Sequence, residues 1–183
     1  KDTVHTKIVA SEYCRLAKLQ TASPVPDLAP IFRRAFPKGH DSAKGPETLV
    51  AVSMLVVSAD VGNIAGVSQA SIKSCLVKTV DATLLDRADL AKHFSLSAAL
   101  TAAFGNDVSQ SLGIWKEVAD SGPNGSGFSY VDLAADRSGI KIGEAMADPA
   151  RAAAMIAWLG KADDTQLLPV AQLALVEGLS EAE

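Results

Sequence analysis

The chain has 183 residues, a formal net charge of −4, and 48% hydrophobic but only 5% aromatic residues. This length fits one domain with a real core. The high hydrophobic fraction and low net charge exclude a disordered chain, and a pI near 5.4 gives no electrostatic footprint for nucleic acid. The 31 alanines favour helices over strands. Composition therefore predicts a single all-α domain.

The first half of the sequence predicts three helices separated by proline-rich breaks. Their ranges are 4–20, 27–36 and an apolar helix that Pro46 opens in the stretch 46–67. A membrane-spanning helix needs about 20 largely apolar residues. Because Asp60 interrupts the apolar stretch, we expect a buried helix and no membrane span. The segment 67–80 has mixed periodicity, and we favour a helix there over a strand.

Cys14 and Cys75 are the two cysteines of the chain, and their spacing fits neither a metal site nor a CxxC redox motif. One interpretation is a disulfide between an N-terminal helix and a mid-chain helix, which suits an oxidising compartment such as the periplasm. The alternative is two buried free thiols that act as small hydrophobic side chains.

From Asp86 onward the helical signal is stronger, and four helices are expected at 86–105, 107–121, 130–147 and 148–161. Ser129 is the predicted N-cap of the third, with Asp132 as a reciprocal capping acid. Asp148 is the predicted N-cap of the fourth, with Pro149 at its first position. The result is an irregular bundle of about seven helices. It divides into an N-terminal region (1–85), a motif-bearing core (86–161) and an acidic, loosely held tail (162–183) in which 167–179 could dock a last helix.

Ionisable residues gather in three consecutive predicted helices of the core. His93 lies in the first, Glu117 and Asp120 in the second, and Asp132 and Asp136 in the third. Spacings of three and four residues place each acidic pair on one helical face. If these faces converge, the five residues form an inward polar cluster in a bundle of small side chains.

A cluster of this kind has the minimum equipment for glycoside hydrolysis, which needs one carboxylic acid and a second carboxylate. We assign Glu117 as the general acid, Asp120 or Asp132 as the second carboxylate, and His93 as an orienting partner, with Asp136 in the same site. A glycine-rich loop follows Glu117 and could line a sugar cleft. The expected substrate-binding residues are Lys116, Gly125, Gly127 and Ser129.

Three other interpretations remain open. A divalent cation could bind the same His and carboxylates, but the Glu-x-x-His pairs of di-iron bundles are missing, and we expect no metal or cofactor. Ser126 or Ser129 with His93 could form a nucleophilic set, but no G-x-S-x-G motif is present. The third interpretation is purely structural: the cluster is a buried polar network that joins three helices. Acid–base pairs of adjacent residues would then be solvated ion pairs that contribute little to stability.

The motifs D-R-x-D-L-x-K-H-F-x-x-S-A-A-L (86–100), K-E-x-x-D (116–120) and G-S-G-F-S-x-x-D-L-A-A-D-x-x-G (125–139) resemble, in this order, the YfiM-like family of predicted periplasmic lipoproteins. The matched part covers about 55 residues. The resemblance implies an α-helical domain in the bacterial envelope and supplies no reaction. The residues that match the family's motifs are His93, Lys116, Glu117, Asp120, Asp132 and Asp136. The chain differs from the family in its N-terminal region of about 85 residues, and it has no lipidated N-terminal cysteine.

Together these patterns predict an exported envelope protein that hydrolyses a cell-wall or envelope glycan by carboxylate chemistry. Its expected partner is that glycan or another envelope component. The alternative, from a different functional class, is a non-enzymatic interaction or scaffold module. A divalent-metal-binding protein is the third hypothesis.

Overall fold

The computed structural model describes residues 4–105, 129–177 and 179. These residues form seven α-helices and four short 3₁₀ helices, with two isolated β-bridges and no strand. The predicted all-α single domain is therefore confirmed. The elements are α1 (Val4–Ala22), α2 (Leu28–Ala35), η1 (Ser42–Lys44), α3 (Gly45–Val56), η2 (Ala59–Ala65), η3 (Gln69–Ile72), α4 (Ala88–Phe104), α6 (Tyr130–Ala147), α7 (Ala152–Leu159), α8 (Asp164–Leu167) and η4 (Val170–Ala174).

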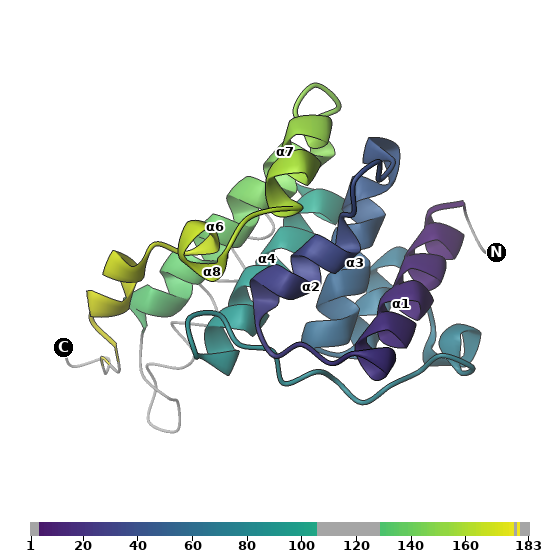
Figure 1. Ribbon diagram of the computed structural model, residues 1–183, viewed down its shortest axis with the longest axis horizontal. Coiled ribbons are helices and arrows are strands. Elements are labelled where there is room, and N and C mark those ends of the chain that lie inside the picture. The colour runs from purple at the N-terminus through teal and green to yellow at the C-terminus, as the bar shows by residue number, and fades with distance from the viewer. Residues whose placement is uncertain (1–3, 106–128, 178, 180–183) are drawn as a thin grey trace.

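Four long helices lie side by side in the order α1, α3, α4 and α6, and the short helix α2 lies in front of the middle of this row, against α3 (Figure 1). The central member is α3, in which every residue except Pro46 is buried. A helix that is apolar around its whole circumference needs neighbours on all sides, and α1, α2, α4 and α6 supply them. The sequence therefore places a helix that is apolar on all sides at the centre of the domain.

The region 46–80 differs from its prediction in two places. The apolar helix ends at Val56 because Ser58 caps a new 3₁₀ helix, accepting a hydrogen bond from the Asp60 backbone N–H at 3.1 Å. The helix expected over 67–80 is also wrong, because only the short turn η3 forms there. A turn follows it, then a segment without regular secondary structure, in which the Val80 N–H donates to the Leu55 carbonyl at 2.9 Å.

Cys14 and Cys75 form a disulfide, with their Cα atoms 5.2 Å apart. The bond joins the middle of α1 to the turn after η3. Close by, the Tyr13 hydroxyl accepts a hydrogen bond from the Val77 N–H at 3.3 Å. Of the two interpretations of the cysteines, the cross-link is therefore the one that the structure supports, although its mid-chain partner is a turn rather than a helix.

The last segment packs on the domain through α8. Leu167 and Leu168 are buried in the core, and Asp164 accepts a hydrogen bond from the Ala29 N–H at the start of α2 (2.9 Å). This carboxylate satisfies a free amide of another helix, and burial raises the pKa of Asp164. Helix α7, which precedes α8, begins at Ala152 and not at the predicted residue 148, because Asp148 caps a preceding turn.

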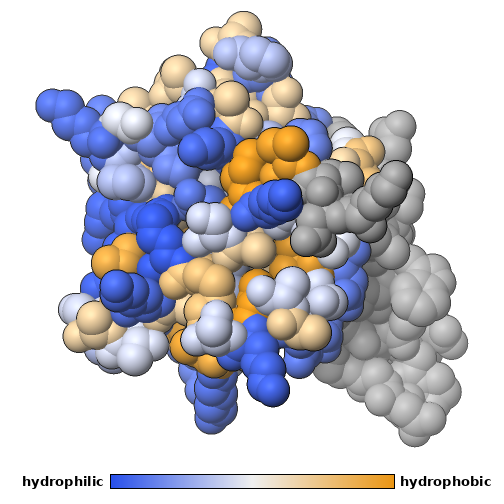
Figure 2. Space-filling view, turned by 90° about the vertical axis from the view of Figure 1, so that its right-hand side faces the viewer, coloured by the Kyte–Doolittle hydropathy of each residue, from blue (hydrophilic) through white to orange (hydrophobic). Residues whose placement is uncertain are grey.

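The face on the α1 side of the molecule carries hydrophobic side chains at its middle, between hydrophilic ones (Figure 2). A groove of about 420 Å³ lies between the ends of α1, α3, α4 and α6, lined by residues that include Val9, Val50 and Ile64. None of the described helices is both long and apolar enough to cross a membrane.

Candidate functional site

The candidate site lies where α4 and α6 pack against each other. His93 and Ser97, four residues apart, face α6, while Asp132 and Asp136, also four apart, face α4. Further along α6, Gly139 brings the two backbones close together. A Cβ atom at Gly139 would lie 2.2 Å from the Phe94 carbonyl oxygen. Small residues at this interface therefore allow short polar side chains to meet across it.

The centre of the site is the His93 imidazole, which lies between two carboxylates. Its Nδ1 is 3.1 Å from Asp136 Oδ1, and its Nε2 is 3.3 Å from Asp132 Oδ2. The side chains of His93, Asp132 and Asp136 are 11%, 12% and 7% exposed. We name these three residues the His93 cluster.

The His93 ring is positively charged at neutral pH. Burial alone would lower its pKa, but the hydrogen bonds and charges of Asp132 and Asp136 outweigh burial and raise the pKa of His93 to about 10. An imidazolium donates both of its N–H groups, so each nitrogen donates to one carboxylate. With no free lone pair at neutral pH, the ring is not in the state that the base of a serine nucleophile needs.

Each carboxylate of the cluster also has an oxygen without a hydrogen-bond partner. Asp136 Oδ1 accepts from both His93 and the Ser97 hydroxyl, the latter at 2.6 Å. By contrast, Asp136 Oδ2 and Asp132 Oδ1 are buried and accept no hydrogen bond within the described part of the chain. A buried acceptor without a partner costs about 1–3 kcal/mol.

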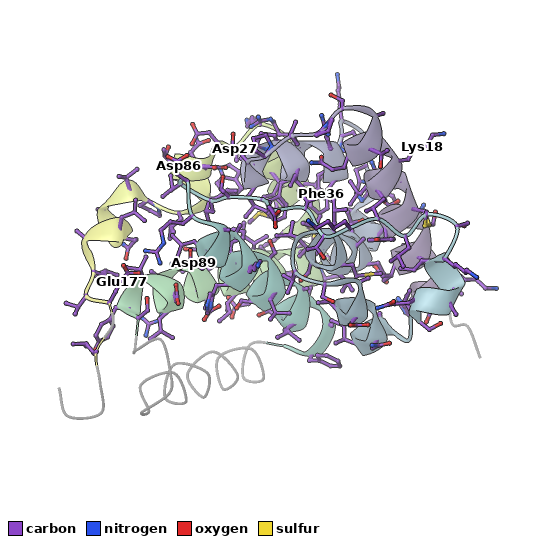
Figure 3. The ribbon with its side chains drawn as sticks, turned by 90° about the horizontal axis from the view of Figure 1, so that it is seen from below. Lys18, Asp27, Phe36, Asp86, Asp89 and Glu177 are labelled. Carbon is purple, nitrogen blue, oxygen red and sulfur yellow. A yellow bond between two sulfur atoms is a disulfide. The ribbon has the colours of Figure 1, made fainter. Side chains whose placement is uncertain are left out.

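Arg87 lies at the solvent-facing edge of the cluster. A turn with left-handed backbone at Leu85 (φ 53°) and Asp86 (φ 64°) places it immediately before α4. Its guanidinium is 3.8 Å from Asp132 Oδ1 and bonds to Asp89 at 2.5 Å and to Glu177 at 2.6 Å. Asp89 and Glu177 lie at the same end of the molecule (Figure 3). These hydrogen bonds hold the pKa of Arg87 above its ordinary value.

Ser129 is the N-cap of α6, as predicted, and its hydroxyl accepts a hydrogen bond from the Asp132 N–H at 3.1 Å. The predicted reciprocal cap by the Asp132 side chain is wrong. That carboxylate turns toward His93 instead, because an imidazolium is a stronger donor to a carboxylate than a backbone amide is. Ser129 Oγ also lies 3.3 Å from Glu177 Oε1, which links the cap to the Arg87 edge.

Of the sequence-predicted site residues, the structure brings His93, Asp132 and Asp136 together, with Ser129 beside them at the start of α6. The others, Lys116, Glu117, Asp120, Gly125 and Gly127, lie outside the described residues. The predicted helices 86–105 and 130–147 therefore bring their ionisable residues together, and the contribution of the predicted helix 107–121 stays a prediction. Among the residues that are described, no three His, Cys, Asp or Glu side chains are arranged to hold a metal ion.

Three residues of this site, Arg87, Ser97 and Glu177, were not predicted from the sequence. Ser97 could have been found, because it lies one helical turn after His93 and shares its face. Arg87 belongs to a quoted motif but carried no assigned role. Glu177 gave no signal, because its partner Arg87 is 90 residues away.

Comparison of the chain with protein families, with curated proteins and with solved structures found no match. The function must therefore be argued from the geometry of the site.

Proposed function

We propose that the protein is a hydrolase in which the His93 cluster is part of the catalytic centre. The observation that carries this proposal is the pair of buried carboxylate oxygens, Asp132 Oδ1 and Asp136 Oδ2, which accept no hydrogen bond from any described residue and lie beside a buried imidazolium. Burying charges costs free energy, and apolar side chains of similar volume are often as stable or more so. An incompletely satisfied ionic cluster is therefore a poor device for stability and is typical of a functional site.

In the proposed mechanism, Asp132 is the carboxylate that acts on the substrate. Asp136 fixes the His93 ring, and the ring in turn fixes Asp132 through Oδ2, which leaves Oδ1 to accept a proton from an attacking water. A carboxylic acid protonates the leaving oxygen, and we assign this role to Glu117 from the sequence. His93 and Asp136 are positioning residues, because the charged ring accepts no proton at neutral pH.

The proposed substrate is a glycan of the bacterial envelope. Two carboxyl groups are the usual equipment for glycoside hydrolysis, and the Cys14–Cys75 disulfide supports an oxidising compartment outside the cytoplasm. The resemblance to periplasmic lipoproteins supports the same location.

The test is the release of reducing ends from purified cell-wall glycan by the full chain. We expect Asp132→Asn, an isosteric change, to lower the rate at least about 100-fold while the melting temperature changes by only a few degrees. Glu117→Gln should cause a similar loss. The matched control is Asp60→Asn, which alters an exposed acid on η2 that bonds to Gln69 and should leave the rate unchanged. A wild-type chain that releases no reducing ends, or an Asp132→Asn variant with full activity, would overturn the proposal.

A second candidate function is a non-enzymatic interaction module, in which the cluster only locks α4 to α6. The observation that favours it is burial, since the three side chains are 7–12% exposed. This hypothesis predicts that the wild type has no glycan turnover and that Asp136→Ala lowers the melting temperature without a separate functional defect.

A further inference from the structure

A concave site lies on α6, on a different face from the His93 cluster. The groove is about 500 Å³ in volume and runs between α6 and η4, which lies beside the first half of that helix (Figure 1). Arg137, Ser138 and Lys141 line it from α6, and Gln172 lines it from η4. Ligand pockets commonly have volumes of about 300–1,000 Å³, so this groove has room for a small ligand or for part of a chain.

The charge of the groove is positive. Arg137 and Lys141 are exposed, lie one helical turn apart, and form no ion pair with any residue in the described ranges 4–105 and 129–177. Among the described residues that line the groove, none is acidic. In a chain of net charge −4, two cations on one concave surface whose described lining holds no acidic residue favour an anionic ligand.

The other lining groups indicate what kind of anion fits. The Ser138 hydroxyl and the Gln172 amide can donate to and accept from hydroxyl groups, while the rings of Tyr130 and Pro169 offer flat apolar surfaces. Alternating hydroxyls and apolar ring faces are the features of a sugar chain. A bilayer surface is too flat to enter a concave groove, and two cations are too few for stable attachment to anionic lipid.

We propose that the groove between α6 and η4 binds an acidic glycan through its carboxylates, with Arg137 and Lys141 as the anion-binding residues. The groove and the candidate active site both lie near the start of α6, since Tyr130 lines the groove and Asp132, two residues later, belongs to the His93 cluster. As a statement about the substrate, this inference rests on the proposed function. As a statement about binding, it can be tested without turnover.

The test is calorimetric titration of the full chain with tetragalacturonate, with its neutral methyl ester, and with peptide-free glycan strands that carry muramic carboxylates. We expect both acidic glycans to bind at least about tenfold more tightly than the ester, since guanidinium–carboxylate bonds are strong and directional. The Arg137→Gln/Lys141→Gln double variant should lose about tenfold or more in affinity for them. The Asp132→Asn variant should bind as the wild type does, which separates failure of this inference from failure of the proposed hydrolase.

The matched control is the Lys18→Gln/Lys73→Gln double variant, which removes the same charge from a distant part of the molecule; Lys18 lies at the opposite end from Glu177 (Figure 3). Its affinity should stay within about twofold of the wild-type value. The inference is overturned if neither acidic glycan binds, if the methyl ester binds equally well, or if both double variants lose affinity equally. It is also overturned if a polyglutamate peptide or phosphatidylglycerol vesicles bind more tightly than the glycans and lose that binding in Arg137→Gln/Lys141→Gln.

Discussion

The α1–α3 and α4–α6 interfaces of this protein are built in different ways. On the α1–α3 side, the α1 side chains Val9, Tyr13 and Leu16 are buried in the hydrophobic core, and a disulfide adds a covalent cross-link from α1 to the turn after η3. Between α4 and α6, glycines allow backbone contact, and the side chains that meet include a charged imidazolium and two carboxylates.

The two interfaces therefore differ in how they contribute to the stability of the fold. Burial of apolar area stabilises by about 25 cal/mol per Å², so the α1–α3 side needs no further explanation. The α4–α6 side places charges where their desolvation is costly, and two of its carboxylate oxygens have no hydrogen-bond partner in the described part of the chain. Function is therefore expected at the second interface, and changes at the two interfaces should have effects of different kinds.

The largest expected effect is on the α1–α3 side. Replacing both cysteines, Cys14→Ser/Cys75→Ser, should lower the free energy of unfolding by about 4 kcal/mol, because the disulfide closes a loop of 61 residues and limits the unfolded chain. Urea denaturation with and without dithiothreitol measures it. The variant should not respond to the reductant, and a wild type equally stable after reduction would contradict the expectation.

At the α4–α6 interface, Asp136→Ala should lower the free energy of unfolding by about 3 kcal/mol, because it leaves a buried imidazolium and the Ser97 hydroxyl without their shared acceptor. The matched control is Asp89→Ala. Asp89 is also a carboxylate in a short ion pair, but its side chain is 48% exposed, so the cost should stay under about 1 kcal/mol. Equal losses of unfolding free energy for the two variants would show that burial does not distinguish the His93 cluster from the Arg87–Asp89 ion pair.

The contrast between the interfaces also explains what the sequence could predict. Helix positions near strong local signals were predicted closely, as for Ser129 at the start of α6 and Gly105 at the end of α4. Errors occurred where distant contacts override local preference. The segment 67–80 has mixed periodicity, and most of it forms no helix, because the disulfide and hydrogen bonds with Tyr13 and Leu55 hold it against other elements. Asp164 is a similar case, because a residue 135 positions away supplies its partner.

For the candidate site, helical periodicity predicted only which residues share a face of one helix. The i, i+4 spacing of Asp132 and Asp136 placed them on one face, and His93 was conspicuous on an apolar helix. Which helix would face which, and the protonated state of the ring, depend on the packing of α4 against α6 and could not be read from spacing. The Arg87–Glu177 pair depends on how the last segment packs, for which the sequence carries no local signal.

The charge of His93 predicts a specific pH dependence. Its folded-state pKa of about 10 is above the unfolded value of about 6.5. The stabilisation is therefore complete below pH 6.5 and is lost as the pH rises through 10. Between pH 7 and pH 9 the loss should be up to about 2.7 kcal/mol for one proton. Denaturation of the wild type and of His93→Gln at both pH values isolates this contribution, because other titrating groups are common to the two proteins. Parallel stability curves would show that the ring is neutral.

The smallest expected effect tests whether backbone contact is what brings the cluster together. Alanine in place of a helical glycine normally stabilises a helix by up to about 1 kcal/mol. At Gly139 the sign should reverse, with a loss of about 2 kcal/mol, because the new Cβ would lie 2.2 Å from a carbonyl oxygen that cannot move without shifting α4.

Gly45→Ala is the matched control for this variant. Its Cβ would be equally close, 2.2 Å, to the Met146 sulfur, but a flexible thioether can change rotamer, so the change should cost less than about 1 kcal/mol. Since Asp136 lies one helical turn before Gly139, separation of the helices should also lengthen the bond to His93 and lower the pKa of the ring, which NMR titration would detect. If Gly139→Ala is as stable as the wild type and its His93 titrates at the same pH, the charged side chains alone hold α4 and α6 together.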